Sequence, residues 1–346
     1  MVSSIIRPFL AGILLLPFFL LTGCQSDTSS GYLANATALQ ALADEPLDSK
    51  PWQFGNRTGH EIVTPHYQIY TTIKDPIYQH LLVKVLEASH ARAVKMDPES
   101  HVDGPLVCYV FRNRDEWEAY TKMRGGANAG IYLHIAAGGY CQQGVFAGYD
   151  LGRDQTLSVI AHESWHQFSW FAFKDRLPSW LEEGLATQNE GVEWDGVTPR
   201  FASEDNFQRW LALKAALREN RMWKISDLVR MHAGQAIKRQ QKDVDSYYAE
   251  LWSLVLFMKS SPVYLPRMMH LIDDAREGKL TVALAGSGLT KAEIDNFTER
   301  WNTIAGPIYL RKYITNDPDA MQAEYEAWAR NLTASWPPKH VATPLD

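Results

Sequence analysis

The sequence predicts an α+β protein in which the strands come first and the helices follow. Strand patterns, with apolar residues at alternate positions or in short runs, are concentrated in residues 61–150. Over residues 151–335 the apolar residues recur at helical spacing. A block of strands followed by a block of helices is typical of α+β domains rather than of alternating βαβ folds. We therefore expect one domain over residues 61–335, with an N-terminal mixed β-sheet and a mostly helical C-terminal part.

The strand-rich part contains two clear strands with a helix between them. Apolar and polar residues alternate from Tyr67 to Ile73, which predicts a strand and the start of ordered structure near residue 66. Asp75 and Pro76 are the residue types of an N-cap and a first helical position, so a helix is expected from there to about residue 96. The apolar run at residues 106–111 predicts a buried strand.

A short helix and a glycine-rich stretch complete this part. Asn113, followed three residues later by Glu116, predicts a capping box. Further strands are expected at residues 131–136 and 144–149. In the second half the apolar periodicity predicts helices at 156–172, 178–190, 204–219, 245–260, 263–276, 290–303 and 318–332.

The N-terminus has the features of a signal peptide over residues 1–23. Arg7 precedes an apolar run at residues 8–21 that is too short to span a bilayer comfortably. The run ends in the sequence LTGC, which resembles the lipobox of bacterial lipoproteins and makes Cys24 the expected site of lipid attachment. The residue after it, Gln25, resembles an outer-membrane sorting signal. The alternative is a plain secretory signal that happens to end near a cysteine.

Composition limits the classes of partner. The net charge is −6, and no clustered basic face is evident, so we expect no nucleic-acid partner. Residues 24–60 are rich in small and polar residues and are predicted to be a flexible tether with at most a short helix around residues 36–43, and residues 336–346 are predicted to be a loose tail. Cys108 and Cys141 could form a disulfide in an exported protein, but a buried free thiol is an equally open alternative for Cys108.

The strongest chemical signal is an H-E-x-x-H motif at residues 162–166. It lies in a segment with helical spacing, and residues four apart on a helix share one face, so His162 and His166 can converge on one metal ion. Glu163 lies beside the first ligand, where its carboxylate can accept a proton from an attacking water. The two histidines are therefore candidate zinc ligands, and Glu163 is a candidate general base.

A second motif, PSWLEEGLA at residues 178–186, supplies a third candidate ligand. The two motifs together resemble those of the gluzincin peptidases (the peptidase MA-like superfamily), in which a W-L-x-E-G helix follows the H-E-x-x-H helix. The resemblance implies a zincin-like fold and makes Glu183, seventeen residues after His166, the third ligand of one zinc ion. Glu182 is interpreted as a solvated acid in the first helical turn. Gly184 is expected to allow a close approach of neighbouring backbone.

The resemblance extends over roughly residues 64–275 and implies an oxyanion donor. A tyrosine on a helix after the third ligand recurs in gluzincins, and Tyr248 matches that place, with Tyr247 as an alternative. Zinc-bound histidines usually donate their other ring N–H to a carboxylate, for which Asp205 and Glu190 are both candidates. Thr187 occupies the position at which a thermolysin-like brace would carry an acid.

The glycine-rich segment 138–149 precedes the metal helix, where zincins have the sheet edge that binds extended substrate. An exposed edge offers main-chain hydrogen bonds to a peptide, although glycine-rich strand ends are also common turns. The acidic G-x-M-E-N motif of aminopeptidase relatives is not found here, which favours internal cleavage. The other histidines show no ligand spacing; they are His60, His66, His80, His90, His101, His134, His232, His270 and His340.

The expected function is therefore that of a lipid-anchored zinc metallopeptidase of the bacterial cell envelope, in a Gram-negative cell at the outer membrane. Its partners would be a peptide or protein substrate and, through Cys24, the membrane. The alternative is a catalytically silent, lipid-anchored binding or scaffold protein that retains the fold. Non-peptide amides or esters remain open as substrates, because the same chemistry attacks any activated carbonyl.

Overall fold

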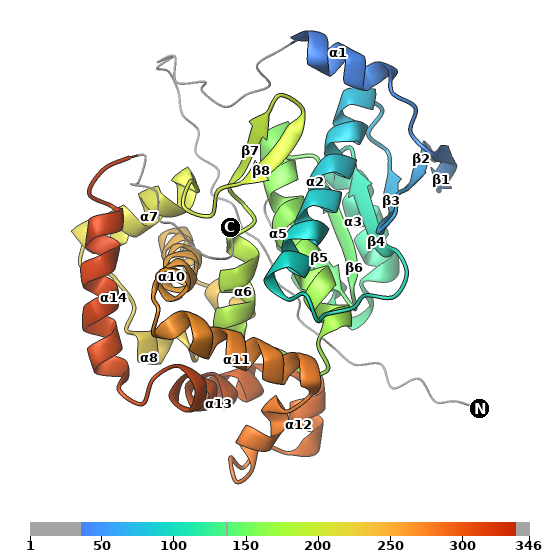
Figure 1. Cartoon of the computed structure of the whole chain (residues 1–346). Helices are drawn as coiled ribbons and strands as arrows, with labels where there is room; N and C mark the ends of the chain where they lie inside the picture. The colour runs from blue at the N-terminus through green and yellow to red at the C-terminus, as the bar shows by residue number, and fades with distance from the viewer. Residues whose placement is uncertain (1–35, 136–137, 337–346) are drawn as a thin grey trace.

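A mixed six-stranded sheet occupies the N-terminal half of the molecule, and helices make up most of the rest (Figure 1). The computed structural model describes residues 36–135 and 138–336. The predicted signal peptide, Cys24 and all but the first residue of the predicted tail lie outside these residues. Within the described parts, no helix has both the length and the apolar character needed to cross a membrane.

The sheet has the strand order β1-β2-β3-β4-β6-β5. Its three central strands β3, β4 and β6 run parallel, and the flanking strands pair antiparallel. The strand bounds are β1 Ser49–Phe54, β2 Arg57–Val63, β3 Tyr67–Thr71, β4 Leu106–Phe111, β5 Gly139–Gln142 and β6 Val145–Tyr149. A separate hairpin consists of β7 Val192–Asp195 and β8 Thr198–Phe201.

The predicted tether at residues 24–60 is more ordered than expected where the structure describes it. The short helix allowed there is α1 (Ala36–Asp44), but strand β1 and the start of β2, which were not predicted, also lie within that range. The two strands form a hairpin whose turn begins at Gly55, with a φ of +58° that glycine adopts at little cost. Most side chains of β1 are exposed, so the strand lacks the apolar alternation that would have identified it.

One face of the sheet is covered by two long helices, α2 (Pro76–Met96) and α5 (Arg153–Ala172). Inward-facing residues of β3 and β4 and apolar residues of the two helices form one continuous core. The side-chain amide of Gln167 on α5 donates to the carbonyls of Val107 (2.8 Å) and Gly144 (3.0 Å). These bonds fix the register of α5 against β4 and β6. Helix α3 (Arg114–Arg124) packs against β4 and β6 from the other side.

The helical half is built around α10 (Gln241–Ser260), which is buried along most of its length and contacts α6, α7, α11 and α14. In Figure 1 these helices fill the left and lower parts of the molecule, with α5 and α6 between them and the sheet. The remaining helix bounds are α4 Ala129–Tyr132, α6 Ser179–Thr187, α7 Phe207–Arg218, α8 Ile225–Leu228, α9 Ala233–Ala236, α11 Tyr264–Glu277, α12 Lys291–Asn296, α13 Glu299–Tyr309 and α14 Pro318–Leu332.

Three local predictions differ from the structure. The strand expected at residues 131–136 is not formed in its described part, residues 131–135; helix α4 ends there at Tyr132, whose buried ring stacks on Tyr140 at 3.9 Å. The helix expected at 290–303 is two helices, separated where Phe297 adopts a φ of +48°. Asn113 caps α3 as predicted, but the Glu116 side chain bonds to Thr72 and Arg112 instead of closing a capping box.

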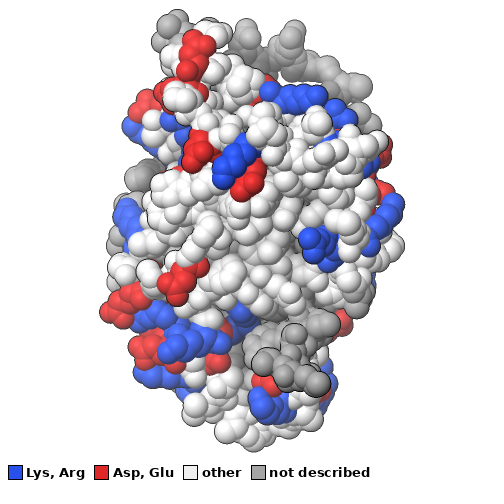
Figure 2. Space-filling model, turned by 90° about the vertical axis from the view of Figure 1, so that its right-hand side faces the viewer, with Lys and Arg blue, Asp and Glu red and all other residues white. Residues whose placement is uncertain are grey.

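Figure 2 views the molecule from the side on which β1 and β2 lie in Figure 1. On this face Lys and Arg side chains lie in small separate groups interspersed with Asp and Glu, around a broad uncharged area. The face therefore offers local charged sites rather than one continuous basic surface.

Candidate metal centre

Helix α5 brings the two histidines of the H-E-x-x-H motif onto one face. The Nε2 atoms of His162 and His166 lie 3.2 Å apart, and both side chains are buried. The motif lies in the middle of a 20-residue helix that packs on α2 and on the sheet. Neither imidazole therefore depends on a mobile helix end for its position.

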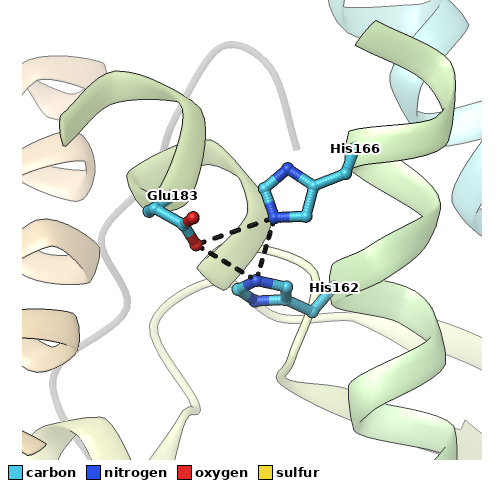
Figure 3. Close-up of side chains that lie close together, drawn as sticks. All are labelled: His162, His166 and Glu183. Carbon is cyan, nitrogen blue, oxygen red and sulfur yellow. Dashed lines mark hydrogen bonds and ion pairs between the residues drawn. The ribbon is translucent and has the colours of Figure 1, made fainter. Parts of the chain in front are cut away.

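Helix α6 adds Glu183 to this pair (Figure 3). Its Oε2 atom lies 3.4 Å from Nε2 of His162 and 3.6 Å from Nε2 of His166. These three residues form a group that could hold a metal ion. As expected, neighbouring backbone approaches Gly184 closely, and that backbone belongs to α10. A Cβ at Gly184 would lie 3.0 Å from the Leu251 carbonyl oxygen and 2.4 Å from a methyl group of Val255.

The protons on the histidines show what this group can bind. His162 Nδ1 lies 2.9 Å from Glu190 Oε1, and His166 Nδ1 lies 2.9 Å from Glu182 Oε1. An ionised carboxylate only accepts hydrogen bonds, so each Nδ1 carries a proton. In the neutral imidazoles both Nε2 atoms then present lone pairs to Glu183 and to each other. Such a set of electron-pair donors could hold a metal ion.

The charges around the group favour a positive charge at its centre, which either a proton on the histidines or a metal ion between them would supply. Burial alone would raise the pKa of Glu183, but the two histidines outweigh it and lower that pKa to about 2. Burial likewise opposes the charged form of His166, yet Glu183 and Glu182 raise its pKa well above the usual value. The site contains four carboxylates but only two imidazoles and one guanidinium that could carry positive charge. The carboxylates belong to Glu163, Glu182, Glu183 and Glu190, and the basic groups to His162, His166 and Arg209.

Glu163 is completely buried, and neither of its carboxylate oxygens has a hydrogen-bond partner. Burial raises its pKa to about 7, against the opposing effect of the two histidines. A carboxylate with that pKa can take up and release a proton near neutral pH. Oε2 of Glu183 also lacks a hydrogen-bond partner. Orphaned buried carboxylate oxygens next to two imidazoles are what a site for a cation and a water would leave.

Of the two acids considered as braces for the histidines, the structure brings Glu190 to His162. Its carboxylate also accepts Arg209 Nε at 2.8 Å, Arg209 Nη2 at 2.9 Å and Asn206 Nδ2 at 2.7 Å. Burial alone would raise the pKa of Glu190, but Arg209 and His162 outweigh it and lower that pKa to about 2. The Nδ1 atom of each histidine is already bonded to a glutamate, His162 to Glu190 and His166 to Glu182, so neither pairing involves the other candidate, Asp205.

The interpretation of Glu182 as a solvated acid is wrong. Its side chain is only 14% exposed, and its carboxylate accepts His166 Nδ1–H and the Ser169 hydroxyl at 2.6 Å. The sequence showed only that Glu182 begins a helix; the docking of α6 on α5 turns it towards His166. Thr187, at the thermolysin-like position, donates its hydroxyl to the Gly184 carbonyl instead.

The two candidate tyrosines on α10 differ in their surroundings. The ring of Tyr248 is 6.5 Å from that of His162, and the guanidinium carbon of Arg209 lies 5.1 Å from the Tyr248 ring centre. Burial and the charge of Glu183 raise the pKa of Tyr248 well above the usual value, so its hydroxyl keeps its proton. Tyr247 donates its hydroxyl to the Met231 carbonyl at 3.3 Å. These contacts favour Tyr248 as the tyrosine of the site.

Sequence spacing gave no reason to single out His232, yet the structure buries it near Glu183, whose charge acts on it. It caps α9, and its Nδ1 atom accepts the Gly234 N–H at 3.0 Å. The proton of the neutral ring is therefore on Nε2. Burial lowers the pKa of His232, which keeps this N–H donor uncharged. No ligand motif could have revealed it, because its place depends on how α9 docks.

The edge of the sheet next to α5 is β5, while β6 lies inside the sheet between β4 and β5. Within the glycine-rich segment 138–149, only β5 can therefore offer main-chain N–H and C=O groups to a substrate. The two cysteines of this region, Cys108 and Cys141, are both buried and free, so the structure has no disulfide between them. Cys108 instead donates its thiol to Gln167 Oε1 at 3.2 Å.

Comparison with protein-family models, curated proteins and solved structures gave no match for this chain. The chemistry of the site therefore has to be judged from its own geometry.

Proposed function

We propose that this chain is a zinc-dependent peptidase with a zincin-like fold of the gluzincin type. The observation that carries the proposal is the convergence of His162, His166 and Glu183 beside the unpartnered carboxylate of Glu163. Two neutral imidazoles and one carboxylate form a common ligand set of catalytic zinc, which leaves a fourth position for water or substrate.

The spacing of the ligand atoms supports zinc. The three atoms are separated by 3.2, 3.4 and 3.6 Å. The corners of a tetrahedron with bonds of about 2.0–2.1 Å, as zinc forms with nitrogen and oxygen, lie roughly 3.3–3.4 Å apart. The donor atoms therefore already have the separations that a tetrahedral ion requires. Cobalt and nickel also bind such ligand sets, so the identity of the ion is part of the test.

Each residue of the site would then have its own role in hydrolysis. When bound, zinc would supply Lewis acidity and lower the pKa of a water towards about 7. Glu163 would accept a proton from the attacking water and later deliver it to the leaving amine nitrogen, for which a pKa of about 7 is suited. Tyr248 would donate its hydroxyl to the carbonyl oxygen as negative charge develops there.

We further propose an extended peptide as substrate and the cell envelope as location. Strand β5 is the last strand of the sheet, so a peptide of any sequence could add to its outer edge through main-chain hydrogen bonds. Internal cleavage is favoured because the sequence shows no acidic motif for a free amine. Lipid attachment at Cys24 would hold the enzyme at the membrane of a bacterial envelope.

The alternative is a metal-binding scaffold protein without turnover, and Glu163 distinguishes the two. A scaffold has no chemical use for a carboxylate that is buried without a hydrogen-bond partner. An enzyme that must remove a proton from water needs such a carboxylate as its base.

The first experiment measures metal content. The purified protein is reconstituted, dialysed and analysed by elemental mass spectrometry beside Glu183→Ala, Glu163→Gln and a control, Glu193→Gln, whose acid is exposed on β7. We expect one zinc per chain in wild type, Glu163→Gln and the control, and loss of zinc in Glu183→Ala. A wild-type protein without stoichiometric metal would contradict the proposal.

The second experiment measures cleavage of unfolded casein by the same four proteins. Wild type and Glu193→Gln should cleave, whereas Glu163→Gln should be inactive although it retains zinc. Zinc binding with no cleavage of a broad peptide panel by any of the proteins would favour the scaffold alternative. Equal activity of wild type and Glu163→Gln would rule out the proposed base.

A further inference from the structure

A second polar pocket lies at the edge of the sheet where β3 and β4 end. Its volume is about 400 Å³, and it is lined by Asn56, Arg57, Thr58, Lys74, Arg112 and Glu116. Lys74 follows β3 and Arg112 follows β4, and these strands are parallel, so both end at the same edge. The start of β2 joins them because β2 runs antiparallel to β3. None of these residues belongs to the metal centre.

The single acid of this pocket is fully engaged. The Glu116 side chain is 3% exposed, and its Oε1 atom accepts Arg112 Nε at 2.7 Å, with Arg57 Nε at 3.7 Å. Its Oε2 atom accepts the hydroxyl of Thr72 at 2.5 Å. Glu116 therefore orients the two arginines, and both of its buried oxygens already have partners in the protein. A buried, charged side chain with a purely organising role is typical of a built site.

The groups that remain available in the pocket are all hydrogen-bond donors or cations. Each arginine uses its Nε towards Glu116, which leaves the terminal nitrogens of both guanidinium groups. Lys74 is exposed and makes no hydrogen bond or ion pair with the described residues. The side chains of Asn56 and Thr58 are also exposed and add neutral donors. Three cations against one saturated carboxylate leave a local excess of positive charge.

The place of the pocket on the sheet also suits a ligand. Helices α2 and α3 begin at Pro76 and Arg114, just after Lys74 and Arg112, but Asp75 and Asn113 already accept their first free N–H groups, so the positive charge of the pocket comes from its side chains. The carboxyl ends of parallel strands are the usual place for ligands on open sheets.

We infer that this pocket binds a phosphate group. Paired arginine forks and a lysine match the several acceptor oxygens of a phosphate better than one carboxylate. The charges on the face in Figure 2 lie in separate groups, which suits one compact oxyanion and not a long polyanion. The phosphate group could belong to a free phosphate compound or to the headgroup of a phospholipid, because both present the same acceptor oxygens.

The test is calorimetric titration of the full chain with inorganic phosphate at low ionic strength. We expect saturable binding that weakens about tenfold or more in Lys74→Ala and in Arg57→Ala, because each loses a charge-assisted contact. The control Lys50→Ala removes the same charge from an exposed position of neighbouring β1 and should bind as wild type does. Glu183→Ala should also bind as wild type does, which separates this pocket from phosphate bound at the metal centre.

Flotation with phosphatidylcholine vesicles, with and without phosphatidic acid, identifies the source. Binding to phosphatidic acid that is lost in Lys74→Ala points to a lipid headgroup, and binding of inorganic phosphate alone points to a free phosphate compound. The inference is overturned if neither probe binds, or if Lys50→Ala reduces binding as much as Lys74→Ala does. These outcomes do not depend on whether the proposed peptidase activity exists.

Discussion

The metal centre and the phosphate pocket both contain buried carboxylates, but they leave opposite kinds of atom unpaired. At the metal centre Glu163 and Glu183 retain oxygens without partners, and both histidines present lone pairs. In the pocket at the sheet edge, Glu116 is saturated and the arginines retain N–H groups. The unpaired atoms favour a cation and water as ligands of the first site and an oxyanion as the proposed ligand of the second.

The largest effect is expected where an unpaired carboxylate is made neutral. Glu163→Gln keeps the size of the side chain but removes its ability to accept a proton, and general-base catalysis contributes typically 10²–10⁴-fold. We expect kcat on a fluorogenic peptide to fall by about this factor, with metal content unchanged. A fall that is accompanied by loss of zinc would mean that Glu163 acts as a ligand and not as a base.

Replacing Arg209 tests whether its guanidinium group, which is permanently charged, holds the residues of the candidate metal centre in place. Arg209 and Glu190 are each 2% exposed, and breaking such a buried pair costs about 3–5 kcal/mol. We expect Arg209→Met to lower the free energy of unfolding by that amount in denaturant titrations and to weaken zinc binding. The control is Arg218→Met, whose pair with Glu219 is exposed and is worth less than about 1 kcal/mol.

A smaller change is expected from the acid behind His166. Partners of this kind typically contribute 10–100-fold to metal affinity, and a glutamine can still accept the Nδ1–H bond. Glu182→Gln should therefore weaken zinc binding by about tenfold, measured by competition with a chelating dye, while Glu193→Gln leaves it unchanged. Unchanged affinity in Glu182→Gln would show that its contact with His166 serves folding alone.

Glu250 provides a third case for comparison with the two sites, because it is a buried carboxylate that belongs to neither of them. One oxygen accepts the Trp223 N–H at 2.9 Å and the other has no partner. Burial raises its pKa well above the usual value, so the folded protein keeps a proton that the unfolded chain loses above about pH 4.5. Its contribution to stability is complete below that pH and declines as the pH rises through the folded-state pKa.

Glu250→Gln cannot ionise and should therefore become more stable than wild type as the pH rises. We expect a difference of roughly 1–2 kcal/mol in the free energy of unfolding at pH 8, and little difference at pH 4. Denaturant titrations at both values measure it. A difference that does not vary with pH would show that Glu250 stays ionised in the folded protein and is stabilised by contacts of its carboxylate.

The sequence predicted that the candidate metal ligands would lie close together, but it did not predict which acids bond to the two histidines. The offset of four between His162 and His166 follows from helix geometry alone, so the pair could be recognised without a fold. The contacts of Glu182 and Glu190 with the histidine Nδ1 atoms depend on how α6 and the chain after it dock on α5. No local pattern records that docking, and an acid in a first helical turn has an ordinary explanation of its own.

The fold shows the same limit. Strands β3, β4 and β6 have a buried face and were predicted because burial leaves an apolar pattern. Strand β1 is largely exposed and β2 buries only Gly59 and Ile62, so neither strand shows an apolar alternation in its sequence. The dipeptide Gly55-Asn56 is a turn signal that could have revealed the hairpin. The helix break at Phe297 has no comparable signal, since an aromatic residue rarely adopts a positive φ.

Arg209 has a consequence for anyone who would transplant this site into another scaffold. Through Glu190 it orients His162, and its guanidinium also lies against the ring of Tyr248, so one side chain from α7 positions groups on two other helices. Grafting the two sequence motifs alone would carry over the ligands but not the geometry of their surroundings. The smallest portable unit consists of α5, α6, the segment with Glu190, α7 and α10, and a designer would have to move it whole.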